Sequence, residues 1–173
     1  LRNTTTGFGN IAVGTNALLS NITGSGSVAI GYNALTNSTT NIANTAVGYA
    51  AMQSNISGAG NTVFGDFALS NNLTGSSNVA FGHNALIVST VTGNTALGFQ
   101  TLESNTTGLQ NVAVGYNALE SNSTGSASTA IGYNALNLCT ATGTVSNTAV
   151  GSQSMQSTTT GIQNITGIIS GNQ

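Results

Sequence analysis

A five-residue motif recurs along the chain at a nearly constant spacing, and this repeat limits the possible folds more than any other feature. In most copies it reads Asn, a β-branched residue, Ala, an apolar residue and Gly. Its glycines are Gly14, Gly31, Gly48, Gly65, Gly82, Gly98, Gly115, Gly132 and Gly151. Successive glycines are 17 residues apart, except for one spacing of 16 and one of 19. Such a period is typical of a solenoid, in which each repeat forms one coil.

Two positions of the repeat are always apolar when the Asn of the motif is counted as position 1. Neither apolar piece is long enough for a helix with a buried face, so one repeat cannot enclose a core. Coils stacked at the strand spacing would align equivalent residues in continuous columns. We therefore predict a core ladder from position 4 (Val13, Ile30, Val47, Phe64, Phe81, Leu97, Val114, Ile131 and Val150) and position 9 (Leu18, Leu35, Met52, Leu69, Leu86, Leu102, Leu119, Leu136 and Met155).

Position 3 is almost always alanine. Side chains alternate along a strand, so if position 4 points into the coil, position 3 points out of it. A small apolar residue repeated on an outer face predicts close packing against neighbouring chains, most simply as a homotrimer. The alternative is that alanine merely fits a solvent-exposed strand. The predicted interchain face comprises Ala12, Ala29, Ala46, Ala80, Ala96, Ala113, Ala130 and Ala149.

The expected fold is an all-β parallel solenoid of about ten coils of 17 residues, with residues 1–173 forming a single repeat domain. The two length changes, at Ile87–Gly93 and Asn137–Ser146, are expected in an outer loop, where insertions are tolerated. Glycines at positions 5 and 15 are expected at corners that need positive φ. The repeat has no evident cap at either end, so we expect the chain to be a window of a longer array.

The chain has almost no formal charge. The charged side chains are Arg2, Asp66, Glu103 and Glu120. One arginine cannot neutralise the phosphates of nucleic acid or of an anionic membrane, so neither is an expected partner. No apolar run approaches the length that spans a bilayer. Cys139 is the single cysteine, and a small apolar filler is its favoured role.

The sequence offers no recognisable catalytic, metal or cofactor site. A nucleophile needs an activating base, and a metal needs several convergent ligands. His83 is the single histidine and stands at position 6, where other repeats have aromatic residues. Asp66 shares that position, whereas Glu103 and Glu120 are successive copies of position 10, as expected of a solvated face. We predict a non-enzymatic protein.

Two rows of residues are candidates for ligand contact or modification. The row at position 6 suits saccharides, although stacking between coils explains it equally well and is favoured; it comprises Tyr32, Tyr49, His83, Phe99, Tyr116 and Tyr133. An asparagine column at position 1 is interpreted as a structural amide ladder. Candidate N-glycosylation sequons, most of them in the predicted outer loop, begin at Asn3, Asn21, Asn37, Asn55, Asn72, Asn105, Asn122 and Asn164.

Two segments of the repeat resemble a known family. Residues 27–31 (Ser-Val-Ala-Ile-Gly) and 111–115 (Asn-Val-Ala-Val-Gly) resemble the head repeats of trimeric autotransporter adhesins of the YadA-like type. The pattern is also similar to repeats of phage and viral tail-fibre proteins. The resemblance covers essentially the whole chain and implies a left-handed β-roll, assembled as a trimer, with a role in host attachment or matrix binding. The repeat here is longer than the adhesin repeat, so no ligand is carried over.

These observations favour a structural or adhesive segment of an extracellular fibre or surface adhesin. Its partners would be further copies of itself, and a host-surface glycan or matrix protein. One alternative is an ice-binding solenoid, suggested by Thr45, Thr62, Thr95, Thr129 and Thr148 at position 2, although valine and isoleucine interrupt this array. Another is a purely structural, glycosylated extracellular filament with no receptor.

Overall fold

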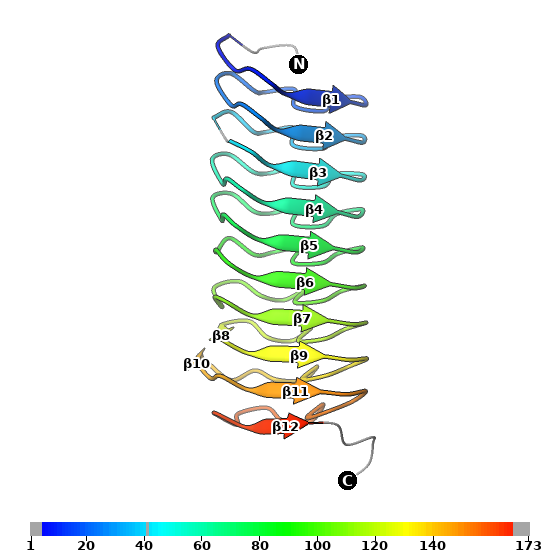
Figure 1. The fold of residues 1–173 in the computed structure, drawn as a ribbon, viewed down its shortest axis with the longest axis vertical. Helices are drawn as coiled ribbons and strands as arrows, with labels where there is room; N and C mark the ends of the chain where they lie inside the picture. Colours follow the sequence, from blue (N-terminus) through cyan, green and yellow to red (C-terminus); the bar gives the residue numbers. More distant parts are fainter. Residues whose placement is uncertain (1–4, 41, 168–173) are drawn as a thin grey trace.

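A computed structural model describes residues 5–40 and 42–167 of the chain. Within these residues the protein is all-β, without a helix, and forms a parallel β-solenoid of about nine turns with about 17 residues per turn. Figure 1 shows the strands stacked one above another along the longest axis of the molecule. The main sheet contains β1 (Ile11–Val13), β2 (Val28–Ile30), β3 (Thr45–Val47), β4 (Thr62–Phe64), β5 (Val79–Phe81), β6 (Thr95–Leu97), β7 (Val112–Val114), β9 (Thr129–Ile131), β11 (Thr148–Val150) and β12 (Ile165–Gly167).

Equivalent residues of successive repeats lie opposite one another in this sheet. Between β3 and β4, for example, Val47 pairs with Phe64. The register survives both length changes, because Phe81 still pairs with Leu97 and Ile131 with Val150. The longer repeat instead contributes to a small second sheet, in which β8 (Gly125–Ser126) pairs with β10 (Gly143–Thr144) outside the main column. The predicted alignment of repeats along one axis is confirmed.

The two faces of each strand are the reverse of the prediction. Position 3 points into the coil: its alanines are fully buried from Ala29 to Ala149, and Ala12 in the first described coil is partly buried. Position 4 points outward, where Val13 is 56% and Phe81 49% exposed. The position-4 residues Val13, Ile30, Val47, Phe64, Phe81, Leu97, Val114, Ile131 and Val150 are thus half-buried or exposed in the single chain, and do not form the core.

The other half of the predicted core ladder is confirmed. The leucines and Met52 at position 9 are fully buried from Leu18 to Leu136, and Met155 packs against them partly buried. They share one apolar cluster with the alanines of positions 3 and 8. A full leucine side chain enters each coil from the wall opposite the strand, so the space that remains on the strand side suits a methyl group. This explains why alanine faces inward and the larger residue of the strand faces water.

The wall that carries position 9 is also bonded from coil to coil, although it is not a regular strand. The position-9 residues have left-handed backbones, with φ between 49° in Leu18 and 54° in Leu86. Their amides donate to the carbonyl of position 8 in the next coil, as from Leu69 to Ala85 at 2.9 Å. Backbone hydrogen bonds therefore join successive coils on more than one side of the solenoid.

The glycines of positions 5 and 15 are required for different reasons. At position 5, φ lies between 125° in Gly14 and 139° in Gly98, as predicted. A Cβ on Gly65 would also meet the carbonyl oxygen of Gly82 in the next coil. At position 15 the prediction of positive φ is wrong, since Gly58 and Gly75 do not have it. These glycines lie too close to an asparagine side chain and to the next coil's backbone for a Cβ to fit.

Candidate interaction surfaces

The outward side chains of positions 2 and 4 form a continuous surface, which we call the outer strand face. It is apolar along position 4 and mixed along position 2, where exposed Ile11 and Val112 alternate with threonines such as Thr62. Equivalent residues stack along it, with the rings of Phe64 and Phe81 5.1 Å apart. No residue at either position carries a charge. Exposed apolar surfaces of this kind mark interaction sites in soluble proteins.

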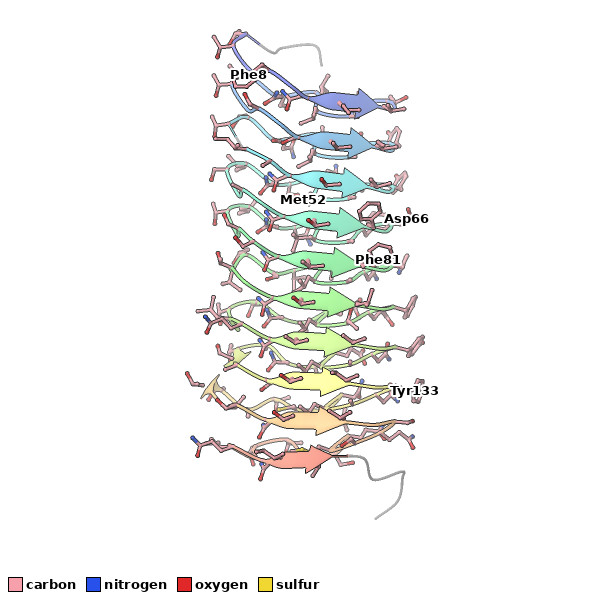
Figure 2. All side chains as sticks on the ribbon, in the orientation of Figure 1. Phe8, Met52, Asp66, Phe81 and Tyr133 are labelled. Carbon is pink, nitrogen blue, oxygen red and sulfur yellow. The ribbon has the colours of Figure 1, made fainter. Side chains whose placement is uncertain are left out.

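A ladder of aromatic rings lies at the corner that follows the strands of the main sheet from β2 to β9, near the residue labelled Tyr133 in Figure 2. Neighbouring rings are 4.9–6.3 Å apart between centroids. In the coil where Asp66 takes position 6, the ring comes from Phe67 at position 7, which sequence reasoning missed. Asp66 accepts a hydrogen bond from the Tyr49 amide at 3.0 Å. The rings in order are Tyr32, Tyr49, Phe67, His83, Phe99, Tyr116 and Tyr133.

The aromatic ladder is a stack between coils, which was the favoured interpretation of the row. Four of the six ring contacts that join its members are within 25° of parallel, so those rings cover part of each other's faces, and the other two contacts flank Phe67 edge-on. A saccharide that stacks on an aromatic side chain needs a free face. Each ring from Tyr49 to Tyr116 has a ring neighbour on both sides, and His83 serves as one ring of the stack.

Two asparagine ladders run through the interior of the solenoid. In the predicted ladder at position 1, Asn61 donates from Nδ2 to the carbonyl of Gly75 at 2.9 Å, and its Oδ1 accepts from the amide of Asn78 at 2.9 Å. The second ladder, at position 12, was not predicted. Its member Asn72 donates to the same Gly75 carbonyl at 2.9 Å and accepts from the Gly75 amide at 2.8 Å. Both ladders therefore fix the corner at position 15.

The second ladder overturns most of the glycosylation prediction. Five sequon asparagines belong to it and are fully buried: Asn21, Asn55, Asn72, Asn105 and Asn122. Four of these side chains both donate to and accept from the backbone of the corner glycine, whereas Asn122 donates to Gly125 and Asn105 and its Oδ1 has no partner. None of the five therefore lies in an outer loop. Asn164 is partly buried and donates to Asn147 Oδ1. Asn3 lies outside the described residues, and Asn37 is the one described sequon asparagine that is exposed.

The remaining polar side chains of interest have structural partners. Glu103 Oε1 accepts from Asn84 and from Gln100, each at 3.2 Å, and Glu120 Oε2 accepts from Asn137 at 2.7 Å. The carboxylates of position 10 thus bind amides of their own or a neighbouring coil. Cys139 is buried at position 12, where it replaces asparagine. Its role as a small buried residue agrees with the prediction.

Within residues 5–40 and 42–167, no cluster of three or more His, Cys, Asp or Glu side chains is arranged to hold a metal ion. The same residues include no helix with the length and apolar character needed to cross a bilayer. Comparison with known proteins found no match among family models, curated proteins or solved structures.

Proposed function

We propose that this chain is a structural and adhesive segment of an extracellular fibre or surface adhesin that self-assembles as a homotrimer. The observation that carries the proposal is the outer strand face, which leaves an uncharged apolar column half-buried or exposed from Val13 to Val150. The proposed role is non-enzymatic and needs no cofactor. It replaces the alanine face of the sequence prediction with the opposite face of the same strands.

Burial of the outer strand face would supply the free energy of assembly. Removing apolar surface from water contributes about 25 cal/mol per Å². Position 4 repeats at every coil and its residues lie in register, so two parallel copies can meet coil by coil along their length. A three-fold axis parallel to the solenoid axis would give each chain the same surroundings and close the assembly. A rod built in this way suits a fibre.

Self-assembly is tested by native mass measurement and analytical ultracentrifugation across a range of concentrations. The wild-type chain is expected to sediment as three chains. Phe81→Asp combined with Val114→Asp places two charges on the outer strand face, and is expected to give a folded monomer because an unpaired charge cannot be buried cheaply. The matched control is Leu73→Asp with Leu109→Asp, two exposed leucines outside positions 2 and 4.

Three outcomes would contradict this assignment: a wild-type chain that stays monomeric at every concentration, a stable assembly of a different number of chains, or a control variant that dissociates as readily as the Phe81 and Val114 variant. Circular dichroism of each variant reports whether the β-solenoid is retained. The adhesive part of the proposal is tested separately, by applying the trimer to arrays of host glycans and matrix proteins. A trimer that binds none of them would indicate a purely structural filament.

Ice binding is a second candidate because it would use the same surface. The threonines of position 2 project onto the outer strand face in register, as Thr45 and Thr62 do. Valine and isoleucine interrupt this row of hydroxyls, and the rings of Phe64 and Phe81 project beside it at position 4. Ice binding needs this face free, so it predicts a monomer with measurable thermal hysteresis, whereas the fibre segment predicts a trimer without it.

A further inference from the structure

All four tyrosines of the sequence belong to the aromatic ladder. They occur as two pairs on adjacent coils, Tyr32 with Tyr49 and Tyr116 with Tyr133. Every other neighbour in the ladder is phenylalanine or histidine. Each tyrosine therefore has one tyrosine neighbour in the ladder, namely the other member of its pair.

The two pairs have the geometry of stacked rings. The centroids of Tyr32 and Tyr49 are 5.2 Å apart with an angle of 13° between the ring planes, and those of Tyr116 and Tyr133 are 5.6 Å apart at 25°. The backbone holds the coils in place beneath them, since the Ala50 amide donates to the Tyr32 carbonyl at 2.8 Å. The Asn134 amide donates in the same way to the Tyr116 carbonyl at 2.9 Å.

The phenol rings are accessible as well as paired. Tyr32, Tyr49 and Tyr116 are each 46% exposed, and Tyr133 is 50% exposed. Exposed side chains change rotamer within nanoseconds, so small rotations can bring two ring edges together while the coils stay fixed. A diffusible oxidant can therefore reach rings that are already positioned for reaction with each other.

We propose that these pairs are sites of oxidative dityrosine crosslinking, which staples neighbouring coils within one chain. The oxidant is a peroxide used by a haem peroxidase. Each phenol loses one electron and one proton to give a phenoxyl radical, and the two radicals form a carbon–carbon bond between their ortho positions. The hydrogens on the two bonded carbons then move to the phenolic oxygens, which restores both aromatic rings. One hydrogen peroxide takes up the two electrons and two protons and leaves as two waters.

This modification goes beyond the proposed role in fibre assembly, because it needs one chain alone. The crosslinks would join residues 17 positions apart, Tyr32 to Tyr49 and Tyr116 to Tyr133. Joining two coils that are already in contact restricts the unfolded chain and leaves the folded backbone nearly unchanged. The two coils joined by each crosslink should therefore resist heat and proteases better after oxidation.

The test treats the intact protein with a haem peroxidase and hydrogen peroxide and follows dityrosine fluorescence and peptide mass. Two crosslinked peptides are expected, one for each pair, each lighter by two hydrogen atoms. Tyr49→Phe should lose the first crosslink and keep the second, and Tyr133→Phe should do the reverse. The double variant Tyr32→Phe with Tyr116→Phe should lose both, while the phenylalanines preserve the ring stack.

Two controls make the result decisive. Dilution should leave the yield of each crosslink unchanged, because both tyrosines belong to one chain. Unfolding the protein in urea before oxidation should abolish the preference for these two pairs. The proposal is overturned if the double variant forms dityrosine as readily as wild type, if mapping shows mixed pairs such as Tyr49 with Tyr116, or if crosslinks join only separate chains and disappear on dilution.

Discussion

At the scale of single residues, the glycines of the repeat are not equivalent. Gly65 combines a φ of 132° with close approach to the carbonyl oxygen of Gly82. Gly26, at position 17, also has positive φ, but an added Cβ there would have nothing within 4 Å. Ala43 and Ala127 occupy the equivalent of Gly26 in other coils with φ of 55° and 60°. Position 17 thus accepts a side chain and position 5 does not.

Replacing Gly65 by alanine is expected to lower the free energy of unfolding by about 3 kcal/mol, since the new methyl group must displace backbone in a strained conformation. Gly26→Ala should cost only the left-handed backbone penalty of about 1 kcal/mol. Denaturant titration of the two variants measures both values. Equal losses would show that backbone conformation alone, and not contact with the next coil, requires glycine at position 5.

The buried asparagines allow a matched prediction. Asn72→Ala removes the donor and the acceptor that bind the backbone of Gly75, leaving its amide without that partner in the interior. The expected loss is about 2 kcal/mol of unfolding free energy. Asn37→Ala, in an exposed sequon, should change it very little. A calorimetric comparison of the two variants decides the matter, and a negligible effect of Asn72→Ala would argue that the amide ladder is not stabilising.

The sequence pointed to the position-1 ladder but misplaced position 12. An Asn-x-Ser/Thr sequon in a polar stretch predicts an outer loop, because polar residues are mostly exposed. The available signal was the spacing from asparagine to glycine, as in Asn55 and Gly58, which lets an amide side chain bind a backbone three residues on. Periodicity predicts that equivalent residues align, but it does not tell which side of the wall they occupy.

At the scale of the element, each strand of the main sheet is three residues long, and only its middle residue faces inward. Such a short strand gives no long alternation from which to assign faces. Position 4 carries the larger apolar residue of each strand, which favours placing it in the core. The volume inside the coil that leucine already fills from the opposite wall decides instead that the smaller residue, alanine, faces inward. Register could be predicted because it depends on the spacing alone, and β4 and β5 pair as that spacing requires.

Neighbouring residues of β7 test the corrected orientation. Ala113→Asp puts a carboxylate where the side chain is fully buried, and is expected to prevent folding of the chain or cost at least about 4 kcal/mol. Val114→Asp places the same group on the outer strand face and should leave the solenoid folded. Far-ultraviolet circular dichroism and thermal melting of both variants measure the difference. If Val114→Asp destabilised the protein more than Ala113→Asp, the sequence-based prediction that position 4 faces the core would be right.

At the scale of the whole molecule, each strand contacts only the strands of adjacent coils. Stability in such an array is approximately the sum of coil terms and neighbour interfaces. The packing between neighbours then does not fix the number of coils, and a whole coil can be removed without changing how the others pack. This modularity explains why one repeat can be a residue short and another two residues long without loss of register.

Deletion of residues 99–115, one period of 17 residues, should give a folded solenoid with one coil fewer and slightly lower stability. It joins Gly98 to Tyr116, which restores the normal order of positions 5 and 6. Deletion of residues 99–107 removes about half a coil and should unfold the region around it. Circular dichroism and limited proteolysis compare the two proteins, and equal tolerance of both deletions would contradict a coil-by-coil architecture.

The hydrogen bonds between coils run along the longest axis of the molecule, in the direction in which the strands are stacked (Figure 1). Tension applied to the two ends would therefore load these bonds one coil at a time, like a zipper, instead of shearing many together. Each coil that peels away would release about 60 Å of extended chain from its 17 residues. A rod of this construction would yield in small, equal steps and absorb work over a long extension.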